Sequence, residues 1–164
     1  RQRQMCIRDR EYTINAALKS KYINEDNLYI NTDFDKVIDI AKRRNIQVVE
    51  RPSHLAGDKV WTQPVINHTE DELGGLDDED IIVILQANSP QITSEKIDEC
   101  IDMLIDNDLF EVHTIDSTMI NNGAIQVIKR KVREQKGKVC YNGVVMTDWV
   151  DVHTIEDIKK IGEL

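Results

Sequence analysis

The stretch Asp80-Ile-Ile-Val-Ile-Leu85-Gln86-Ala-Asn-Ser-Pro90 decides the fold, because an apolar run ends abruptly in a polar loop. The same arrangement occurs upstream, where residues 46–50 lead into Arg51-Pro-Ser-His-Leu-Ala-Gly-Asp58. Short β-branched runs bounded by turn residues predict strands, and residues 80–85 are apolar enough to be buried on both faces of a parallel sheet. Ligands bind outside the carboxyl ends of such strands, so the two loops are expected to form a small-molecule site.

The rest of the chain alternates helical and extended patterns. Apolar residues at helical spacing predict helices over residues 12–21 and 94–107, and a further helix capped by Asp33. A helix is also expected over residues 61–73, with Pro64 in its first turn. Additional strands are expected at residues 28–30, 110–115, 124–131 and 138–146. This alternation predicts an α/β domain with a doubly wound, Rossmann-like, mostly parallel sheet.

The bulk composition excludes several classes of protein. The chain has 164 residues and a formal net charge of -9, which argues against nucleic-acid binding, since that binding depends on Lys and Arg neutralising phosphates. No apolar run approaches the roughly 18 residues of a membrane span, and we expect no signal peptide. Three distant cysteines, Cys6, Cys100 and Cys140, with no CxxC pair predict neither disulfides nor zinc and fit a cytoplasmic protein.

Three further motifs accompany the two strand-end loops, namely Tyr12-Thr-Ile-Asn-Ala-Ala-Leu-Lys-Ser20, Asn31-Thr-Asp33 and Asn122-Gly-Ala-Ile125. Together these motifs resemble the N-acylneuraminate cytidylyltransferases, the CMP-sialic acid synthetases. The resemblance runs from about residue 12 to residue 160 and is strongest up to Pro90. It implies a Rossmann-like three-layer fold of the nucleotide-diphospho-sugar transferase type, and an enzyme that uses CTP and a sugar acid.

The resemblance assigns the two loops to the nucleotide. Arg51 would hold base or phosphate oxygens with its guanidinium, Lys59 would add a point charge, and Thr62 would lie near the cytidine. Gln86 and Asn88 carry carboxamides that can donate and accept at once, as reading a pyrimidine edge requires. The structural alternatives are an Arg51–Asp58 pair that braces its loop, a helix-capping Thr62, and carboxamides that only satisfy loop backbone.

Other residues would serve the sugar acid and a metal ion. The resemblance places Asn122 against the sugar acid, whereas Asn-Gly alone is a common hairpin turn. Asp151 falls on the first carboxylate of a metal-binding Asp-x-Asp-Thr motif, and His153 replaces the second, so the expected Mg2+ site would tolerate Mn2+ better. Thr154 and Asp157 match a helix capping box. The basic residues of 129–138 form either a solvated hairpin face or a site that attracts the sugar carboxylate.

The beginning of the chain departs from the family. Residues 1–10 match no strand or helix period, so we interpret them as non-native or disordered, and residues 11–164 as the cytidylyltransferase-like domain. The family's first strand and its Gly-rich, Lys-containing loop have no counterpart, since no glycine precedes Gly57. We therefore expect an N-terminally truncated domain that has an unpaired sheet edge, is poorly soluble and is catalytically silent when residues 1–164 are expressed alone.

The function predicted is transfer of CMP from CTP to a sialic-acid-like nonulosonate with release of pyrophosphate, by a homodimer that binds neither nucleic acid nor membrane. One alternative is a 3-deoxy-manno-octulosonate cytidylyltransferase or another sugar nucleotidyltransferase. Another is a non-catalytic relative that binds a nucleotide or a partner. The latter is favoured by His153 and Ile92, which stand where the family has Asp and Arg, and by the missing Gly-rich loop.

Overall fold

The computed structural model describes residues 2–57, 60–132, 141–150, 152 and 154–161, and for residues 2–9, 155 and 158 it describes the backbone alone. The chain divides into two compact units, one of Arg1–Tyr22 with Asp77–Leu164 and one of Ile23–Leu76. Lys59, Asp58, Asp151 and His153 lie outside the described residues. Within these ranges, no helix has both the length and the apolar character needed to cross a bilayer.

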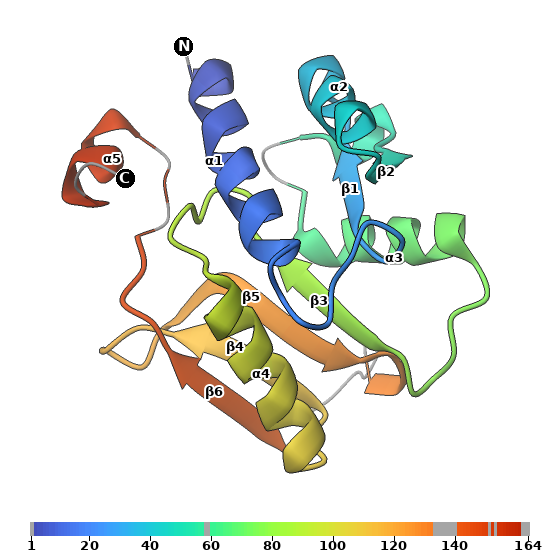
Figure 1. Cartoon of the computed structure of the whole chain (residues 1–164), viewed down its shortest axis with the longest axis vertical. Helices are drawn as coiled ribbons and strands as arrows, with labels where there is room; N and C mark the ends of the chain where they lie inside the picture. Colours follow the sequence, from blue (N-terminus) through green and yellow to red (C-terminus); the bar gives the residue numbers. More distant parts are fainter. Residues whose placement is uncertain (1, 58–59, 133–140, 151, 153, 162–164) are drawn as a thin grey trace. The chain divides into compact units, whose positions relative to one another are not determined.

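The larger unit is built on a four-stranded sheet with the order β3-β5-β4-β6 (Figure 1). Its strands are β3 (Ile81–Leu85), β4 (Glu111–Ile115), β5 (Asn121–Lys129) and β6 (Asn142–Met146). β4 and β6 are parallel, and β5 is antiparallel to both β3 and β4, so β5 alone runs against the other three. The connection over residues 116–120 is too short for a parallel crossover, which is why β5 turns back beside β4.

The expectation that β3 is buried on both faces between parallel strands is wrong. Its neighbour in the sheet is the antiparallel β5, and all five of its apolar residues are half-buried. Among the described residues, β3 pairs only with β5, and β1 (Tyr29–Thr32) of the smaller unit pairs only with β2 (Gln47–Glu50). Each of these two strands therefore has one backbone edge without a strand partner among the described residues. The poor solubility expected from such edges stays a prediction.

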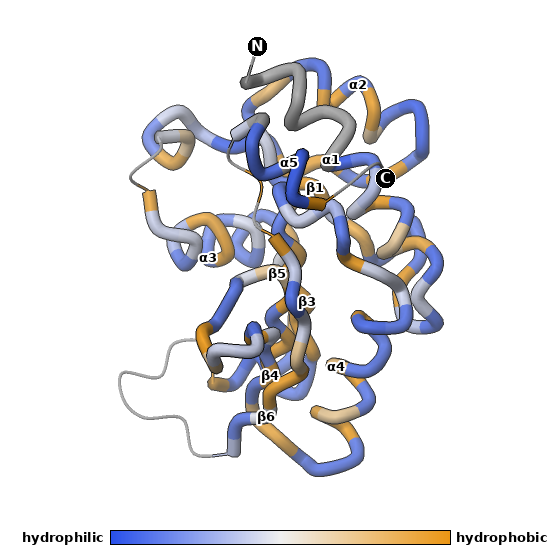
Figure 2. Tube along the Cα trace, turned by 90° about the vertical axis from the view of Figure 1, so that its left-hand side faces the viewer, coloured by the Kyte–Doolittle hydropathy of each residue, from blue (hydrophilic) through white to orange (hydrophobic). Residues whose placement is uncertain are grey.

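α4 (Ser94–Asp106) covers one face of this sheet, and hydrophobic residues concentrate where the two meet (Figure 2). The helix begins after Thr93, whose hydroxyl accepts a hydrogen bond from the Lys96 N–H. Gly143 of β6 allows the close approach, because a Cβ there would lie 2.8 Å from Met103 Sδ. The fully buried core comprises Ile97, Cys100, Leu104, Val112, Ile125, Val127 and Val145. Burial raises the pKa of the Cys100 thiol to about 12, so this cysteine is a packing residue.

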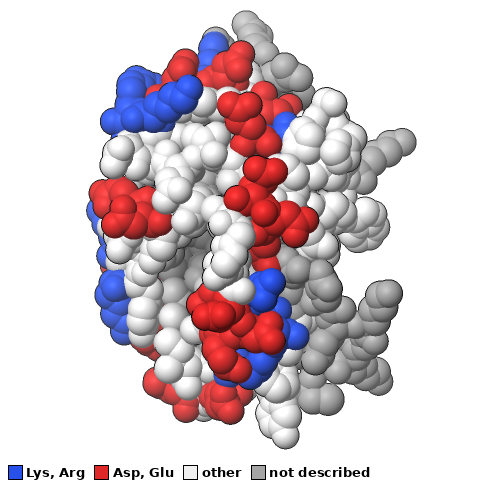
Figure 3. All heavy atoms as spheres, turned by 90° about the vertical axis from the view of Figure 1, so that its right-hand side faces the viewer, with Lys and Arg blue, Asp and Glu red and all other residues white. Residues whose placement is uncertain are grey.

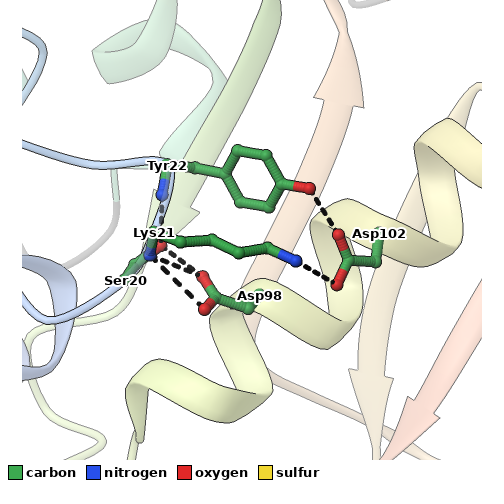
Figure 4. Close-up of polar contacts among 5 residues, drawn as sticks. All are labelled: Ser20, Lys21, Tyr22, Asp98 and Asp102. Atoms are coloured by element: carbon green, nitrogen blue, oxygen red, sulfur yellow. Dashed lines mark hydrogen bonds and ion pairs between the residues drawn. The ribbon is translucent and has the colours of Figure 1, made fainter.

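α1 (Gln2–Ala17) begins ten residues earlier than the predicted helix, which was expected from Tyr12. Residues 2–10 are thus helical, although the sequence shows no amphipathic period there. The turn that follows α1 is tied to α4 (Figure 4): the Ser20 hydroxyl and the Lys21 N–H donate to Asp98, and Lys21 Nζ and the Tyr22 hydroxyl donate to Asp102. Hydrogen bonds from Lys21 and then from Tyr22 lower the pKa of Asp102 below its ordinary value.

The smaller unit pairs β1 and β2 in parallel, with α2 (Asp35–Arg43) packed on them. Val37, Ile40 and Ala41 form the buried face of α2, as the spacing predicts. The predicted cap is wrong, since Phe34 precedes the helix and its N–H donates to the Thr32 hydroxyl. Downstream lie the short 3-10 helix η1 (Ser53–Leu55) and α3 (Thr62–Leu73), with Pro64 in the first turn of α3 as expected.

The end of the chain confirms the capping box. α5 (Ile155–Ile161) follows Thr154, whose N–H and hydroxyl donate to Asp157 Oδ2 at 2.9 Å, while the Asp157 N–H donates back to Thr154 Oγ1 at 3.3 Å. This reciprocal pattern satisfies backbone donors of the first turn and accounts for Thr154 without a catalytic role.

Candidate functional site

The polar loop after β3 is held at both of its ends. The Gln86 N–H donates to Ala124 O at 3.0 Å, which joins the end of β3 to β5, and the Ser89 N–H donates back to Gln86 O at 3.2 Å. Ser89 is buried, and the Ile92 N–H donates to its carbonyl oxygen. The loop is therefore a fixed turn at the carboxyl end of an apolar strand, the place where ligands bind in open α/β sheets.

The segment that precedes α5 lies against this loop. The Val152 N–H donates to Asn88 O at 2.9 Å, and the Val150 N–H donates to Gln91 Oε1 at 2.8 Å. These two contacts bracket position 151, so the backbone on both sides of the predicted metal ligand is attached to the loop of Gln86 and Asn88. The sequence predicted these regions as parts of one site, but the role of Gln91 was missed. Its only signal was a glutamine where the family has leucine.

The carboxamides of Gln86 and Asn88 make no hydrogen bond to any other group in the part of the chain that the structure describes. Both residues are half-buried. The alternative that these amides only satisfy the loop backbone does not hold, because the loop closes through main-chain bonds and Gln91. Gln86 lies over Gly123, where an added Cβ would be 2.8 Å from Gln86 Nε2. The donors and acceptors of the two amides are thus not used by the described part of the chain.

Asn122 has a different arrangement. Its Oδ1 accepts from the Thr114 hydroxyl at 2.6 Å and from the Ala124 N–H at 3.2 Å, and its Nδ2 donates to Thr147 O and Oγ1 at 2.9 and 2.8 Å. Both donor hydrogens and both acceptor positions are used within the chain. The hairpin alternative is wrong, because the turn is formed by residues 116–120 and Asn122 lies inside β5. A contact to a sugar acid would require Asn122 to give up one of these bonds.

The remaining predicted nucleotide residues belong to the smaller unit. Arg51 follows β2 directly, and its Nε donates to Asn31 Oδ1 at 2.7 Å while its Nη2 donates to Asn31 O at 2.8 Å. Thr62 is the first residue of α3, is exposed, and makes no side-chain hydrogen bond among the described residues. The helix-capping alternative for Thr62 is therefore not what the structure contains, since Trp61 precedes α3 without a side-chain cap.

The described residues of the basic cluster form ion pairs with acidic residues of the same chain. Each cation has an acidic partner outside the cluster, in the ion pairs Lys129–Asp108, Arg130–Asp78 and Lys131–Glu79. Acidic side chains are also spread over the face drawn in Figure 3, with Lys and Arg in smaller groups, as the net charge of -9 implies. An anionic ligand would therefore depend on a few local cations and hydrogen-bond donors rather than on a positive surface.

The metal prediction involves residues outside the described ranges. Among the described residues, no group of three His, Cys, Asp or Glu side chains could hold a metal ion. The assignment of Asp151 and His153 as metal ligands therefore stays a prediction. A carboxylate with an imidazole is a donor set that suits Mn2+ better than Mg2+.

The chain is similar to known cytidylyltransferases. The sequence profile of the Cytidylyltransferase family matches residues 10–144. An N-acylneuraminate cytidylyltransferase of Streptococcus agalactiae is 28% identical over 101 residues, which cover 62% of this chain and 24% of that protein. A 3-deoxy-manno-octulosonate cytidylyltransferase of Francisella tularensis is 35% identical over 98 residues, 59% of this chain and 36% of that protein. The chain spans about a quarter to a third of the curated relatives it matches.

Two solved structures share the fold. A CMP-2-keto-3-deoxy-manno-octonic acid synthetase complexed with CTP superposes with a TM-score of 0.67 at 11% identity, covering 93% of this chain and 85% of the other. A 4-diphosphocytidyl-2C-methyl-D-erythritol synthase from Anaerococcus prevotii gives a TM-score of 0.60 at 18% identity, with 93% and 83% covered. The predicted Rossmann-like α/β fold is confirmed, with a mixed sheet. The match to the family over residues 10–144, together with this fold, shows that the chain belongs to the Cytidylyltransferase family.

Proposed function

We propose that the protein containing this chain transfers the cytidylyl group of CTP to a sugar acid. The observation that carries the proposal is the attachment of Val150 and Val152 to the loop that bears Gln86 and Asn88. The backbone on both sides of position 151 is thereby attached to the loop of Gln86 and Asn88. The carboxamides of these two residues have no hydrogen-bond partner among the described residues. The relatives named as cytidylyltransferases of N-acylneuraminate and of 3-deoxy-manno-octulosonate support a sugar acid as the acceptor.

The reaction would be an in-line displacement at the α-phosphorus. The anomeric hydroxyl oxygen of the sugar acid forms a new bond to that phosphorus, the bond to the β,γ-diphosphate breaks, and pyrophosphate leaves while the hydroxyl proton passes to solvent. Such transfers depend mainly on positioning and on electrostatic stabilisation, so no covalent intermediate with the protein is needed. Gln86 and Asn88 would hold the cytosine edge or ribose, and Arg51, Lys59 and Thr62 would contribute further nucleotide contacts.

Asp151 and His153 would hold the divalent cation, Mg2+ or Mn2+. A bound cation would screen the phosphate charges and template the attack. Because the second carboxylate of the family's motif is absent, we propose a stronger preference for Mn2+ than a two-carboxylate site would show. Asn122 would organise the sugar-acid side of the site, and a homodimer would be the working form.

The test is pyrophosphate release by the complete protein encoded by the reading frame that contains residues 1–164. It should be incubated with CTP, with Mg2+ or Mn2+, and in separate reactions with N-acetylneuraminate and 3-deoxy-manno-octulosonate. Release that requires one of these acids supports the proposal and names the acceptor. CTP binding without release under any of these conditions would instead support the non-catalytic alternative, for which the buried Ile92 in place of an arginine is the structural argument.

The variant Asp151→Asn in the same protein tests the metal assignment. A neutral amide loses the charge that a hard cation needs, so turnover should fall by orders of magnitude while the urea unfolding midpoint stays near that of the parent protein. Activity close to that of the parent would contradict the metal assignment. His153→Asp should raise the activity with Mg2+ relative to Mn2+, and an unchanged metal preference would show that His153 is not a ligand.

A further inference from the structure

We infer that Asn31 is a positioning residue that sets the direction of the Arg51 guanidinium. This inference rests on the proposed function, because it concerns how Arg51 reaches a nucleotide. Asn31 lies on β1, one residue before that strand ends, and Arg51 follows the last residue of β2. The two strands are parallel, so both residues are near the carboxyl end of the pair, and the Arg51 N–H donates to Thr32 O at 2.9 Å.

The Arg51 guanidinium makes two hydrogen bonds to Asn31, one to its side chain and one to its main chain. Arg51 Nε donates to Asn31 Oδ1 at 2.7 Å, and Arg51 Nη2 donates to the Asn31 main-chain oxygen at 2.8 Å. These two groups form one edge of the planar guanidinium. A planar group held at two points along one edge has little freedom to rotate about the side-chain bonds, so these two bonds to Asn31 constrain the direction of the fork.

Asn31 is itself oriented by α3. Its Nδ2 donates to Thr69 Oγ1 at 2.8 Å, and the Thr69 hydroxyl donates to Val65 O at 2.9 Å. Because the single hydroxyl hydrogen of Thr69 is used by Val65 O, Thr69 Oγ1 acts as an acceptor toward Asn31. This polarity requires the Asn31 carbonyl oxygen to face Arg51. A flipped amide would place its N–H groups against Arg51 Nε and would lose the side-chain bonds of Asn31 to Arg51 Nε and to Thr69 Oγ1.

The chain of bonds from Val65 through Thr69 and Asn31 to Arg51 therefore runs in one direction and joins α3, β1 and the end of β2. All four residues are half-buried, so these bonds are partly shielded from water. A merely structural clamp between helix and strands would use the same contacts. The two roles differ in whether nucleotide affinity follows the orientation of Arg51.

Two pairs of variants separate these roles. Asn31→Ala removes the acceptor for Arg51 Nε, whereas Asn31→Asp keeps a carboxylate acceptor in its place. Thr69→Val removes the hydroxyl that orients Asn31, whereas Thr69→Ser keeps it with a smaller side chain. The complete protein carrying each variant should be titrated with CTP by calorimetry. The exchange of the Arg51 Nε–H with water should be measured in the same samples by NMR.

In the parent protein the Arg51 Nε–H should exchange slowly. In Asn31→Ala it should exchange fast, CTP affinity should fall about tenfold, and KM for CTP should rise with little change in kcat. Thr69→Val should cause about a threefold loss of affinity with intermediate exchange, and Thr69→Ser and Asn31→Asp should keep slow exchange.

Unchanged CTP affinity in Asn31→Ala together with fast Nε–H exchange would overturn the inference, because affinity would not depend on the orientation of Arg51. A loss of affinity with slow exchange retained would also overturn it, since Asn31 would then contact the nucleotide itself. If the parent protein binds no CTP, the proposed function fails instead. The orientation of Arg51 by Asn31 is then judged by Nε–H exchange alone.

Discussion

Replacing Gly123 by alanine should disturb the site through Gln86 and through the backbone. Gly123 has a φ of 69°, in the left-handed region, where an L-residue with a Cβ is strained by about 1–2 kcal/mol. The new Cβ would also lie 2.8 Å from Gln86 Nε2 and 3.4 Å from Gln86 Cδ. The end of the glutamine side chain is flexible and can rotate away, so the closeness should displace the carboxamide rather than unfold the protein.

The effect on the nucleotide follows from what the displaced amide contributes. A hydrogen bond in a desolvated site is worth about 0.5–1.5 kcal/mol, so Gly123→Ala should weaken CTP binding ~3- to 10-fold, as should Gln86→Ala. In the Gln86→Ala background no side chain meets the new Cβ. The second substitution should then cost almost no further affinity but should still lower the free energy of unfolding by about 1–2 kcal/mol.

The assay is CTP calorimetry on the parent, both single variants and the double variant, with urea unfolding of the same four proteins. The expected pattern is strongly non-additive affinity losses and additive stability losses. Additive affinity losses would refute the argument, because the two residues would then act independently. Full CTP affinity in Gly123→Ala, next to a clear loss in Gln86→Ala, would show that Gly123 does not control the position of the amide.

Three further predictions concern contacts elsewhere in the larger unit. Thr114→Val should lower the free energy of unfolding by about 2–3 kcal/mol, because the buried Ile125 N–H and Asn122 Oδ1 lose their hydroxyl partner. Thr114→Ser keeps the hydroxyl and should lower it by only about 1 kcal/mol, so equal losses in urea unfolding would contradict this. Gln91→Leu should speed hydrogen exchange of the Val150 amide, and unchanged protection would show that the Gln91 contact is not formed in solution. The lowered pKa of Asp102 contributes stability that is present above the unfolded pKa, near 3.9, and is lost as pH falls through the folded pKa. The Asp102→Asn variant should therefore lose less stability than the parent between pH 5 and pH 2. Parallel plots of unfolding free energy against pH for the two proteins would argue against the Lys21 and Tyr22 contacts.

Local patterns determined much of this protein from the sequence alone. Apolar patterns predicted α2, α4 and the run that becomes β3, and Pro64 was placed in the first turn of α3, because such local signals depend on neighbouring residues. The capping box of Thr154 and Asp157 was equally predictable, since both partners lie within one helical turn. The position of the polar loop of Gln86 and Asn88 directly after a strand was also predictable, because turn residues bound the apolar run, whereas its role as a ligand site stays a prediction.

Contacts between distant residues were decided by the tertiary structure. A strand was predicted over residues 124–131, but its antiparallel position between β3 and β4 was not, because the strand pattern alone does not specify which neighbour a strand pairs with. Three of these contacts join segments far apart in the chain: the hydrogen bonds of the Asn122 amide, the bond from Val150 to Gln91, and the bonds from Arg51 to Asn31. A side chain with several donors and acceptors can serve a ligand or its own fold equally well. Only the positions of its neighbours in space decide which of these groups remain for a ligand.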